Sequence, residues 1–478
     1  MIVNTSDTPT PAFLLRQKFP FQPTKGQLEL FNHMEKFLSN DDAQTFLLKG
    51  YAGTGKTTLI STLVKSLPKL GFRTVLLAPT GRAAKVMATY SRKKAMTIHK
   101  KIYRQVANKF TGALEFRRQN NYHTNTVFIV DEASMIPDEA DFGGMNGLLT
   151  DLIEYAFGNE EGGPNKLLFV GDLAQLPPVG KDDSPALDAK YLRDNFHMEV
   201  MEVEMTDVMR QDNDSGILAN ATRLREILWD KIPEIRLSTR GFRDCFRMTG
   251  EKLEDGLNYA YRKYGEENTI VITRSNKTAV AYNRYIRTRI KYQEDEISTG
   301  DRLMVVRNNY TALDEDSPAG FLANGDFVEV LKIRGYEEQY GIRFANCLLQ
   351  LSDYPDQPPF DAKITLNTLD SASPSLTREE SKALYDGVAA DYEHIASKRE
   401  RMQEIRKDPY LNALQVKFAY ALTCHKSQGG QWSAVFIDQG YLTLEQVNQE
   451  FVRWLYTAMT RASLEVFLVN FHGDFFES

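Results

Sequence analysis

A short glycine-rich segment carries residues that could bind the phosphates of a nucleotide. Residues 50–57 read Gly-Tyr-Ala-Gly-Thr-Gly-Lys-Thr and fit the P-loop pattern G-x-x-x-x-G-K-[ST]. The glycines let backbone N–H groups surround a phosphate, Lys56 can bridge the β- and γ-phosphates, and the Thr57 hydroxyl can ligate Mg²⁺. The competing interpretation, a plain glycine-rich turn before a helix, is disfavoured because the pattern and its strand–turn–helix context agree. The nucleotide-binding residues expected in this segment are Gly53, Thr54, Gly55, Lys56, Thr57 and Thr58.

Two adjacent carboxylates could complete the chemistry of this site. Residues 127–130 are an apolar run that delivers Asp131 and Glu132 at its C-terminal end. Ligands of open α/β sheets bind at this end of the strands. We expect Asp131 to hold Mg²⁺ and Glu132 to orient or deprotonate the attacking water. Alone, the pair would be interpreted as a solvated acidic strand end; beside a P-loop it predicts hydrolysis of ATP or GTP.

The segments around these residues alternate between buried strands and helices. Helical patterns lie between several of the apolar runs, for example at residues 57–67 and 82–89. This alternation is typical of parallel α/β sheets covered by helices, and the chain is long enough for two of them. The apolar, β-branched runs that predict strands are residues 46–48, 75–78, 127–130, 167–170, 270–272, 435–437 and 466–469.

Residues 298–409 differ from the rest of the chain and predict an insertion. Residues 298–361 are rich in Gly, Asn, Asp and Pro and contain short alternating runs, which indicates a small β domain. Residues 376–406 then have the pattern of one long charged helix.

Composition excludes several classes of protein. With 478 residues, 42% hydrophobic and 26% charged, the chain is typical of globular proteins, here with about two to four domains. No apolar run approaches the ~18 residues that span a bilayer, and the start of the chain lacks the pattern of a signal peptide. The 3 cysteines are far apart and predict neither disulfides nor a zinc site. We expect a cytoplasmic protein with reduced thiols and no membrane partner.

The charge is distributed unevenly along the chain. The total of 58 Lys and Arg against 64 Asp and Glu gives −6, which would disfavour nucleic acid because phosphates are bound by cations. Residues 1–120, however, hold 20 Lys and Arg against 6 Asp and Glu, and no acidic residue lies between positions 51 and 109. The negative total is therefore a weak argument against a DNA partner.

Further segments resemble, in order and spacing, the motifs of superfamily 1 helicases, most closely the branch that contains RecD, Dda and the PIF-type helicases. The resemblance implies an α/β fold of two RecA-like parallel-sheet lobes. It implies a hairpin inserted in the first lobe, and an SH3-like β domain with a helical segment inserted in the second. The segments that carry it are residues 23–27 (Q motif), 50–57 (motif I), 78–84 (Ia), 97–99 (Ib), 130–135 (II), 171–179 (III), 209–211 (IV), 422–429 (V) and 456–462 (VI).

The resemblance also implies domain boundaries. In relatives the 1B hairpin is called the pin and splits the duplex, and Phe110 lies near the expected tip. The alternative is a hairpin whose aromatic residues only pack on the lobe. The expected domains are lobe 1A at residues 1–99 and 123–197, the hairpin 1B at 100–122, lobe 2A at 198–297 and 410–478, and the SH3-like 2B insertion with its long charged helix at 298–409.

Several residues receive roles at the nucleotide from the resemblance. Gln27 would read the adenine edge and so select ATP, and Gln175 would connect the γ-phosphate to the DNA side. Arg210 and Arg461 are expected to act as arginine fingers, because a guanidinium can neutralise charge on the γ-phosphate. They would reach ATP only when the lobes close, which couples hydrolysis to stepping. The expected catalytic residues are Lys56, Glu132, Gln175, Arg210 and Arg461.

A second set of residues is expected to bind DNA. Four neutral side chains would donate hydrogen bonds to phosphates, two cations would add charge, and one aromatic ring belongs to the pin. For the histidine a structural role is an equal alternative, and for Thr80 and Ser427 helix capping competes. The set is Thr80, His99, Thr423 and Ser427 as neutral donors, Arg82 and Lys426 as cations, and Phe110.

These observations predict an ATP- and Mg²⁺-dependent DNA helicase that moves 5′→3′ on single-stranded DNA, acts at junctions of single- and double-stranded DNA, and is a monomer. The polarity comes from the resemblance alone. Two alternatives stay open: an RNA-directed superfamily 1 helicase, and a P-loop ATPase regulator that acts without nucleic acid. We do not expect a nuclease, because no further carboxylate and lysine cluster for two-metal cleavage is present.

Overall fold

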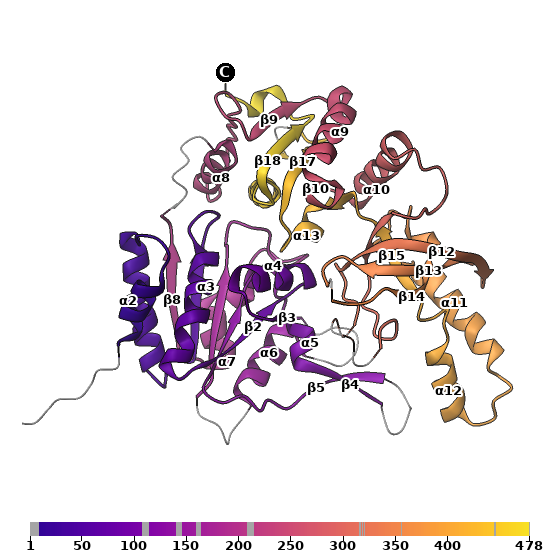
Figure 1. The fold of residues 1–478 in the computed structure, drawn as a ribbon, viewed down its shortest axis with the longest axis horizontal. Helices are drawn as coiled ribbons and strands as arrows, with labels where there is room; N and C mark the ends of the chain where they lie inside the picture. Colours follow the sequence, from indigo (N-terminus) through magenta and orange to yellow (C-terminus); the bar gives the residue numbers. More distant parts are fainter. Residues whose placement is uncertain are drawn as a thin grey trace, which may run out of the picture. The chain divides into compact units, whose positions relative to one another are not determined.

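The computed structural model describes residues 9–107, 114–139, 146–158, 164–207, 215–314, 317, 319, 321–354, 356–443 and 446–477, with side chains except at 105–107 and 114–116. The chain divides into two compact units, drawn in Figure 1. Unit 1 comprises Met1–Pro79, Ala83–Tyr103 and Arg118–Asn213, and unit 2 comprises Thr80–Arg82, Arg104–Arg117 and Asp214–Ser478.

Unit 1 is built on a six-stranded parallel sheet in the order β3-β2-β6-β7-β1-β8. Every residue of β6 and β7 is buried, because their continuous apolar runs pack on both faces of the sheet. The four strands predicted in this part of the chain are confirmed. The strands are β1 (Thr45–Gly50), β2 (Arg73–Ala78), β3 (Ala95–Thr97), β6 (Thr126–Val130), β7 (Lys166–Gly171) and β8 (Val200–Met205).

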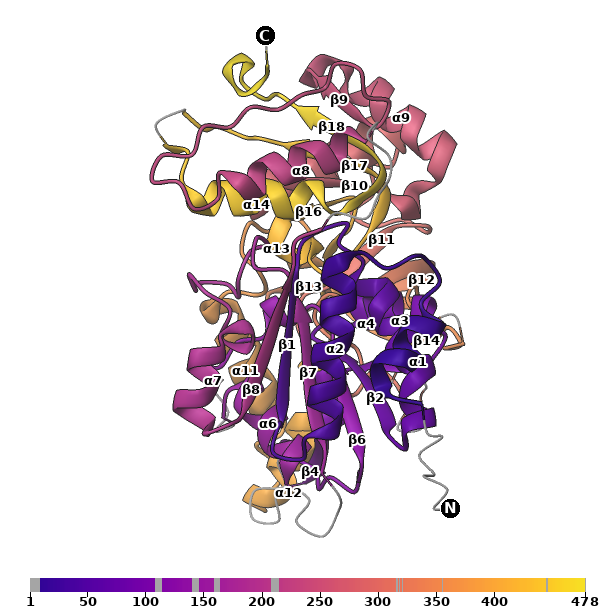
Figure 2. The same cartoon turned by 90° about the vertical axis from the view of Figure 1, so that its left-hand side faces the viewer.

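Helices pack against this sheet through a shared apolar core. Phe31 and Phe37 of α2 are buried with Phe46 of β1 and Leu168 of β7. Figure 2 shows α2 beside β1. The two helices predicted from the sequence are confirmed as α3 and α4. The helices are α1 (Pro11–Lys18), α2 (Lys25–Ser39), α3 (Lys56–Ser66), α4 (Gly81–Ser91), α5 (Ile98–Ile102), α6 (Leu148–Phe157) and α7 (Ala189–Phe196).

Unit 2 contains a second parallel sheet, of five strands in the order β16-β10-β17-β18-β9. Its strands are β9 (Cys245–Met248), β10 (Thr269–Thr273), β16 (Ala421–Thr423), β17 (Trp432–Asp438) and β18 (Ala462–Val469). Its helices are α8 (Gly216–Glu226), α9 (Leu253–Tyr264), α10 (Asn276–Tyr285), α13 (Cys424–Ser427) and α14 (Gln449–Met459). The three strands predicted in this region are therefore confirmed.

A closed five-stranded barrel is inserted in unit 2. Its core is continuous with that of the sheet, since Val330 and Val416 of the barrel belong to the same buried cluster as Val271 and Phe436. The barrel strands are β11 (Arg302–Val305), β12 (Phe327–Gln339), β13 (Ile342–Leu351), β14 (Phe360–Thr365) and β15 (Leu414–Phe418).

The prediction of one long helix at residues 376–406 is wrong. The segment forms two helices, α11 (Arg378–Asp391) and α12 (Lys398–Lys407), between β14 and β15 (Figure 1). Ser397 interrupts the pattern because its hydroxyl accepts the Glu400 N–H at 3.4 Å and caps α12. Both helices bury apolar side chains against Phe344 of the barrel.

Two predicted domain boundaries differ from the structure. Strand β8 pairs with β1 in the first sheet, so that sheet extends beyond residue 197. Strand β15 pairs with β11 and β14, so the barrel insertion extends beyond residue 409. In β8 polar side chains lie between apolar ones, so the sequence does not indicate a buried strand there. The sequence of β15 does not distinguish a barrel strand from a strand of the second sheet.

The hairpin predicted at residues 100–122 contains the two-stranded sheet of β4 (Tyr103–Ala107) and β5 (Leu114–Arg118). Its expected tip, with Phe110, lies outside the described residues. Within the described parts of the chain, no helix has both the length and the apolar character needed to cross a membrane.

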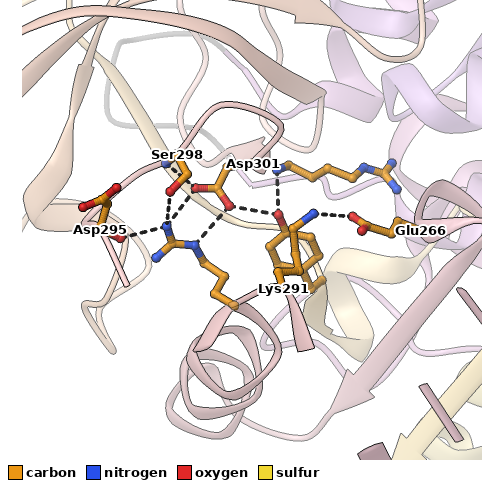
Figure 3. A network of polar contacts seen from close by, with 8 residues as sticks. Glu266, Lys291, Asp295, Ser298 and Asp301 are labelled. Carbon is orange, nitrogen blue, oxygen red and sulfur yellow. Dashed lines mark hydrogen bonds and ion pairs between the residues drawn. The ribbon is translucent and has the colours of Figure 1, made fainter. Parts of the chain in front are cut away.

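A buried polar network joins the start of the barrel to the neighbouring elements of unit 2 (Figure 3). Arg287, in the π-helical turn after α10, donates through Nε and Nη2 to the two carboxylate oxygens of Asp301, at 3.0 and 2.9 Å. The Tyr420 hydroxyl and the Ser298 N–H donate to the same carboxylate at 2.9 and 2.7 Å. Asp301 is fully buried, and every hydrogen bond it needs is supplied.

Candidate active site

The P-loop joins β1 to α3 in unit 1. Gly53 and Gly55 have φ values of 80° and 92°, in the left-handed region that glycine adopts without strain. A Cβ at Gly50 would lie 2.9 Å from Thr54 Oγ1 and 3.2 Å from Met205 Cβ, so a side chain there would push the loop open. The sequence therefore produces a tight turn between β1 and the start of α3, and the N–H groups of such turns can bind phosphate.

Lys56 is the first residue of α3, and its ammonium group lies over the loop. Nζ donates hydrogen bonds to the carbonyl oxygens of Gly50 and Tyr51, at 2.6 and 2.9 Å. Thr57 is exposed in the first turn of the helix, while Thr54 is buried. The Lys56 cation is thus held against the loop, and the roles of Lys56 and Thr57 at a nucleotide stay predictions.

Asp131 and Glu132 directly follow β6. Asp131 Oδ1 accepts the Glu132 N–H at 2.9 Å, and Oδ2 accepts the Tyr90 hydroxyl at 2.6 Å. Burial, followed by the charge of Glu132, raises the pKa of Asp131 to about 6, while the two hydrogen bonds and the charge of Lys56 act in the opposite direction. Asp131 is therefore held by two donors, the backbone of the next residue and the Tyr90 hydroxyl of α4.

Glu132 has a left-handed backbone with φ of 53°, which costs a non-glycine residue about 1 to 3 kcal/mol. Backbone strain of this kind concentrates at functional sites. The unusual conformation directs the chain from the end of β6 into the short helical turn Ala133–Met135.

Gln175 follows β7, the strand that lies between β6 and β1 in the sheet. The Gln175 side chain is buried, and the Gln175 backbone N–H donates to the Asp172 carbonyl at 3.3 Å. Motifs I, II and III thus follow three adjacent strands at their C-terminal ends, where parallel sheets bind ligands.

Gln27 contacts the P-loop. Its Nε2 donates to the Thr54 carbonyl at 3.4 Å, and its Oε1 accepts the Thr24 N–H at 3.2 Å. The second contact belongs to a capping box that starts α2. Gln27 is therefore held next to the loop by the helix it caps, and its role in reading adenine stays a prediction.

The two expected arginine fingers have different outcomes. Arg210 lies outside the described residues. Arg461 is buried in unit 2, where it donates to the carbonyl oxygens of Thr457 and Gly430, each at 3.2 Å. These contacts hold the guanidinium beside the end of α14.

The expected DNA contacts of motif V lie around α13. Ser427 is buried and its hydroxyl donates to the Cys424 carbonyl at 2.8 Å, a bond within α13 and not the helix cap that was its alternative role. Thr423 precedes the helix and makes no side-chain capping bond. Lys426 Nζ is buried and has no hydrogen-bond partner in the described part of the chain, and burial lowers its pKa to about 8.

The remaining expected DNA contacts come from motifs Ia and Ib. His99 lies in α5, with its ring centroid 5.7 Å from that of Tyr103. Thr80 and Arg82 are grouped with unit 2, where the Arg82 guanidinium lies 4.1 Å from the Trp432 ring centroid. Burial lowers the pKa of Arg82. Phe110 is outside the described residues.

The sequence did not reveal two residues near these sites. Tyr90 contacts Asp131 from α4, and burial, followed by the charge of Asp131, raises the pKa of the Tyr90 hydroxyl, which stays protonated. Lys417 of β15 is buried; burial, then the charge of Lys426, lowers its pKa to about 8. Tyr90 is 41 positions from Asp131, and Lys417 Nζ donates at 3.0 Å to the carbonyl of Thr368, 49 positions away, so no local motif marks these contacts.

Two family models match the chain. One, described as an AAA domain, matches residues 23–227, and the other, described as a UvrD-like helicase C-terminal domain, matches residues 418–469. Together they cover more than half of the chain.

Relatives extend over nearly the whole chain. Protein R530 of Acanthamoeba polyphaga mimivirus is 24% identical over 506 residues, which cover 92% of this chain and 98% of that protein. The ATP-dependent DNA helicase dda of Enterobacteria phage T4 is 24% identical over 477 residues, 93% of this chain and 99% of the helicase. The crystal structure of Pif1 helicase from Bacteroides with ADP-AlF3 and ssDNA aligns with 95% of this chain and 94% of its own, at 15% identity and a TM-score of 0.46. The family models, the relatives and the motifs place the chain in superfamily 1, among helicases of the Dda and RecD-like type.

Proposed function

We propose that the chain is an ATP-dependent DNA helicase that moves 5′→3′ along single-stranded DNA and separates duplexes at junctions. One observation carries the proposal: motifs I, II and III follow adjacent strands of one parallel sheet, while motifs V and VI belong to a second parallel sheet. A regulatory ATPase needs only the first of these. In this proposal the sheets are the cores of two RecA-like lobes, the closed barrel is the SH3-like 2B domain, and the helicase acts as a monomer.

At the nucleotide, the hydroxyl and carboxylate oxygens of the site fit Mg²⁺, which prefers oxygen ligands. The Thr57 hydroxyl and the Asp131 carboxylate would hold it, and bound Mg²⁺ neutralises charge on the β- and γ-phosphates. Lys56 would exchange its two loop carbonyls for phosphate oxygens. Glu132 would orient or deprotonate the attacking water, and Gln27 would select adenine.

Coupling to DNA would depend on both units. Gln175 would sense the γ-phosphate, and Arg461, with Arg210, would stabilise the charge that develops on it, so hydrolysis would require closure of the lobes. Single-stranded DNA would be bound by phosphate contacts and released as the lobes open. The proposed contacts are Thr80, Arg82, His99, Phe110, Thr423, Lys426 and Ser427.

The experiment is to measure ATP hydrolysis by the purified chain with poly(dT), with poly(U) and without nucleic acid. We expect hydrolysis to be stimulated by poly(dT) more than by poly(U). Stronger stimulation by poly(U) would indicate an RNA-directed enzyme, and a rate that no nucleic acid changes would indicate a regulatory ATPase. Either result would overturn the proposal.

A further inference from the structure

The carboxylate of Asp131 is held from a second element of unit 1. Tyr90 lies in the last turn of α4, 41 positions before Asp131, and its hydroxyl donates to Asp131 Oδ2 at 2.6 Å. This distance is typical of a strong hydrogen bond from a neutral hydroxyl to a charged carboxylate. Tyr90 is partly buried, so water competes little for the contact.

The other oxygen of the same carboxylate is also fixed. Asp131 Oδ1 accepts the N–H of Glu132 at 2.9 Å. With one donor on each oxygen, the carboxylate plane is oriented by two elements, the end of β6 and the end of α4. Each oxygen keeps a further lone pair, because a carboxylate offers about four acceptor positions. The donors therefore orient the group without using up its capacity to bind a cation.

We propose that Tyr90 is a positioning residue that orients Asp131 for Mg²⁺ in the nucleotide complex. The proposal rests on the assignment of Asp131 as a Mg²⁺ ligand under the proposed function. Groups that hydrogen-bond to a metal ligand orient it and raise its affinity for the metal, and their removal commonly costs about 10- to 100-fold. Tyr90 meets that description: it touches the ligand and reaches neither the P-loop nor Glu132 through any described hydrogen bond of its hydroxyl.

Helix α4, which carries Tyr90, begins next to an expected DNA contact. The helix begins at Gly81, directly after the expected DNA contact Thr80, and Tyr90 lies nine residues further on, about 14 Å along the axis. Helix α4 thus begins at the residue after Thr80 and contains Tyr90.

The test uses Tyr90→Phe, which removes only the hydroxyl. The affinity of the full chain for a fluorescent ADP analogue is measured in Mg²⁺ and in EDTA, so that the gain due to Mg²⁺ is isolated. We expect the gain to fall by about tenfold and the affinity in EDTA to stay within about twofold of wild type. A merely structural role of Tyr90 would lower both affinities together.

Tyr191→Phe is the matched control, because the Tyr191 hydroxyl donates to Asp138 Oδ2 at 2.8 Å in the same unit and is also partly buried. We expect it to behave as wild type. Asp131→Asn separates the two proposals. If Asp131→Asn keeps the Mg²⁺-dependent gain, the assignment of the metal ligand is wrong. If Asp131→Asn loses the gain but Tyr90→Phe keeps it, or loses affinity equally in EDTA, the role of Tyr90 is wrong.

Discussion

Lys56 in unit 1 and Asp301 in unit 2 are both charged groups held by several hydrogen bonds, and their partners differ in kind. The Lys56 ammonium is bound by two neutral carbonyls of its own loop, at 2.6 and 2.9 Å. Asp301 is bound by the fork of Arg287, by Tyr420 and by a backbone N–H, and it is fully buried.

The difference separates a group that can exchange partners from one that cannot. Phosphate oxygens carry charge and would replace neutral carbonyls around Lys56 at a gain. Around Asp301 a charged partner is already in place, so any exchange would leave a buried charge unpaired. The same chemistry would thus serve phosphate binding in unit 1, as proposed, and forms a fixed junction between barrel and sheet in unit 2.

The largest expected effect is on the fixed junction. Asp301→Ala leaves the Arg287 guanidinium buried without its partner, and we expect a loss of about 3 to 5 kcal/mol in the free energy of unfolding. All three tryptophans, Trp229, Trp432 and Trp454, belong to unit 2, so urea unfolding followed by tryptophan fluorescence reports on this unit.

Asp361→Ala is the matched control, because Asp361 forms a two-pronged pair with Arg334 at 2.6 and 3.1 Å that is largely exposed. We expect that substitution to cost about 0 to 1 kcal/mol. Equal losses of unfolding free energy in the two variants would mean that the buried pair of Asp301 contributes no more to stability than the exposed pair of Asp361. ADP affinity, which depends on unit 1, is expected to change in neither variant.

The next effect concerns the exchangeable group. Lys56→Ala removes the cation that would stabilise charge on the transferring phosphate, and we expect ATP turnover to fall by at least about 100- to 1000-fold. Glu132→Gln is expected to abolish turnover by removing the group that orients water. Both variants are expected to keep their affinity for single-stranded DNA, measured by fluorescence anisotropy. Loss of DNA binding in both would contradict the separation of the ATP and DNA sites.

The smallest expected effect concerns Lys426, the cation expected to contact DNA in motif V. Lys426 Nζ is buried without a described hydrogen-bond partner, and burial lowers its pKa to about 8. The ammonium is charged below pH 8 and loses its proton above it, so a contact with a DNA phosphate would weaken as the pH rises. Between pH 7 and pH 9 we expect the affinity of wild type for single-stranded DNA to fall by up to about tenfold, the worth of one charged hydrogen bond.

Lys426→Arg is expected to flatten this dependence, because arginine stays protonated over the whole range. Lys382→Arg, on the exposed surface of α11, serves as the control and should keep the wild-type profile. The assignment of Lys426 would be wrong if the Lys426→Arg variant and wild type lost affinity in parallel.

Much of the fold could be predicted because its signals are local. Apolar runs predicted seven strands, and the P-loop pattern predicted the turn at residues 50–57, where Gly53 and Gly55 have positive φ. Strand β8 was missed because Glu202 and Glu204 are exposed and interrupt its apolar residues, so it has no continuous apolar run. The single helix predicted at 376–406 was wrong because one capping serine divides a charged segment.

Contacts between distant residues could not be predicted. Tyr90 and Asp131 are 41 positions apart, and Arg287, Asp301 and Tyr420 are spread over more than a hundred positions. In each case the partners meet only because the tertiary fold brings a helical residue, Tyr90 or Arg287, next to the end of a strand. A motif encodes groups that act along one loop, whereas these groups depend on the tertiary fold.

The most direct test of a DNA helicase with 5′→3′ polarity is a strand-displacement measurement on two duplexes of equal sequence, one with a 5′ single-stranded tail and one with a 3′ tail. With ATP and Mg²⁺, we predict that the chain separates the 5′-tailed duplex and leaves the 3′-tailed duplex intact, and that Lys56→Ala separates neither. Separation of the 3′-tailed duplex alone would contradict the polarity, and failure on both substrates would contradict the assignment as a helicase.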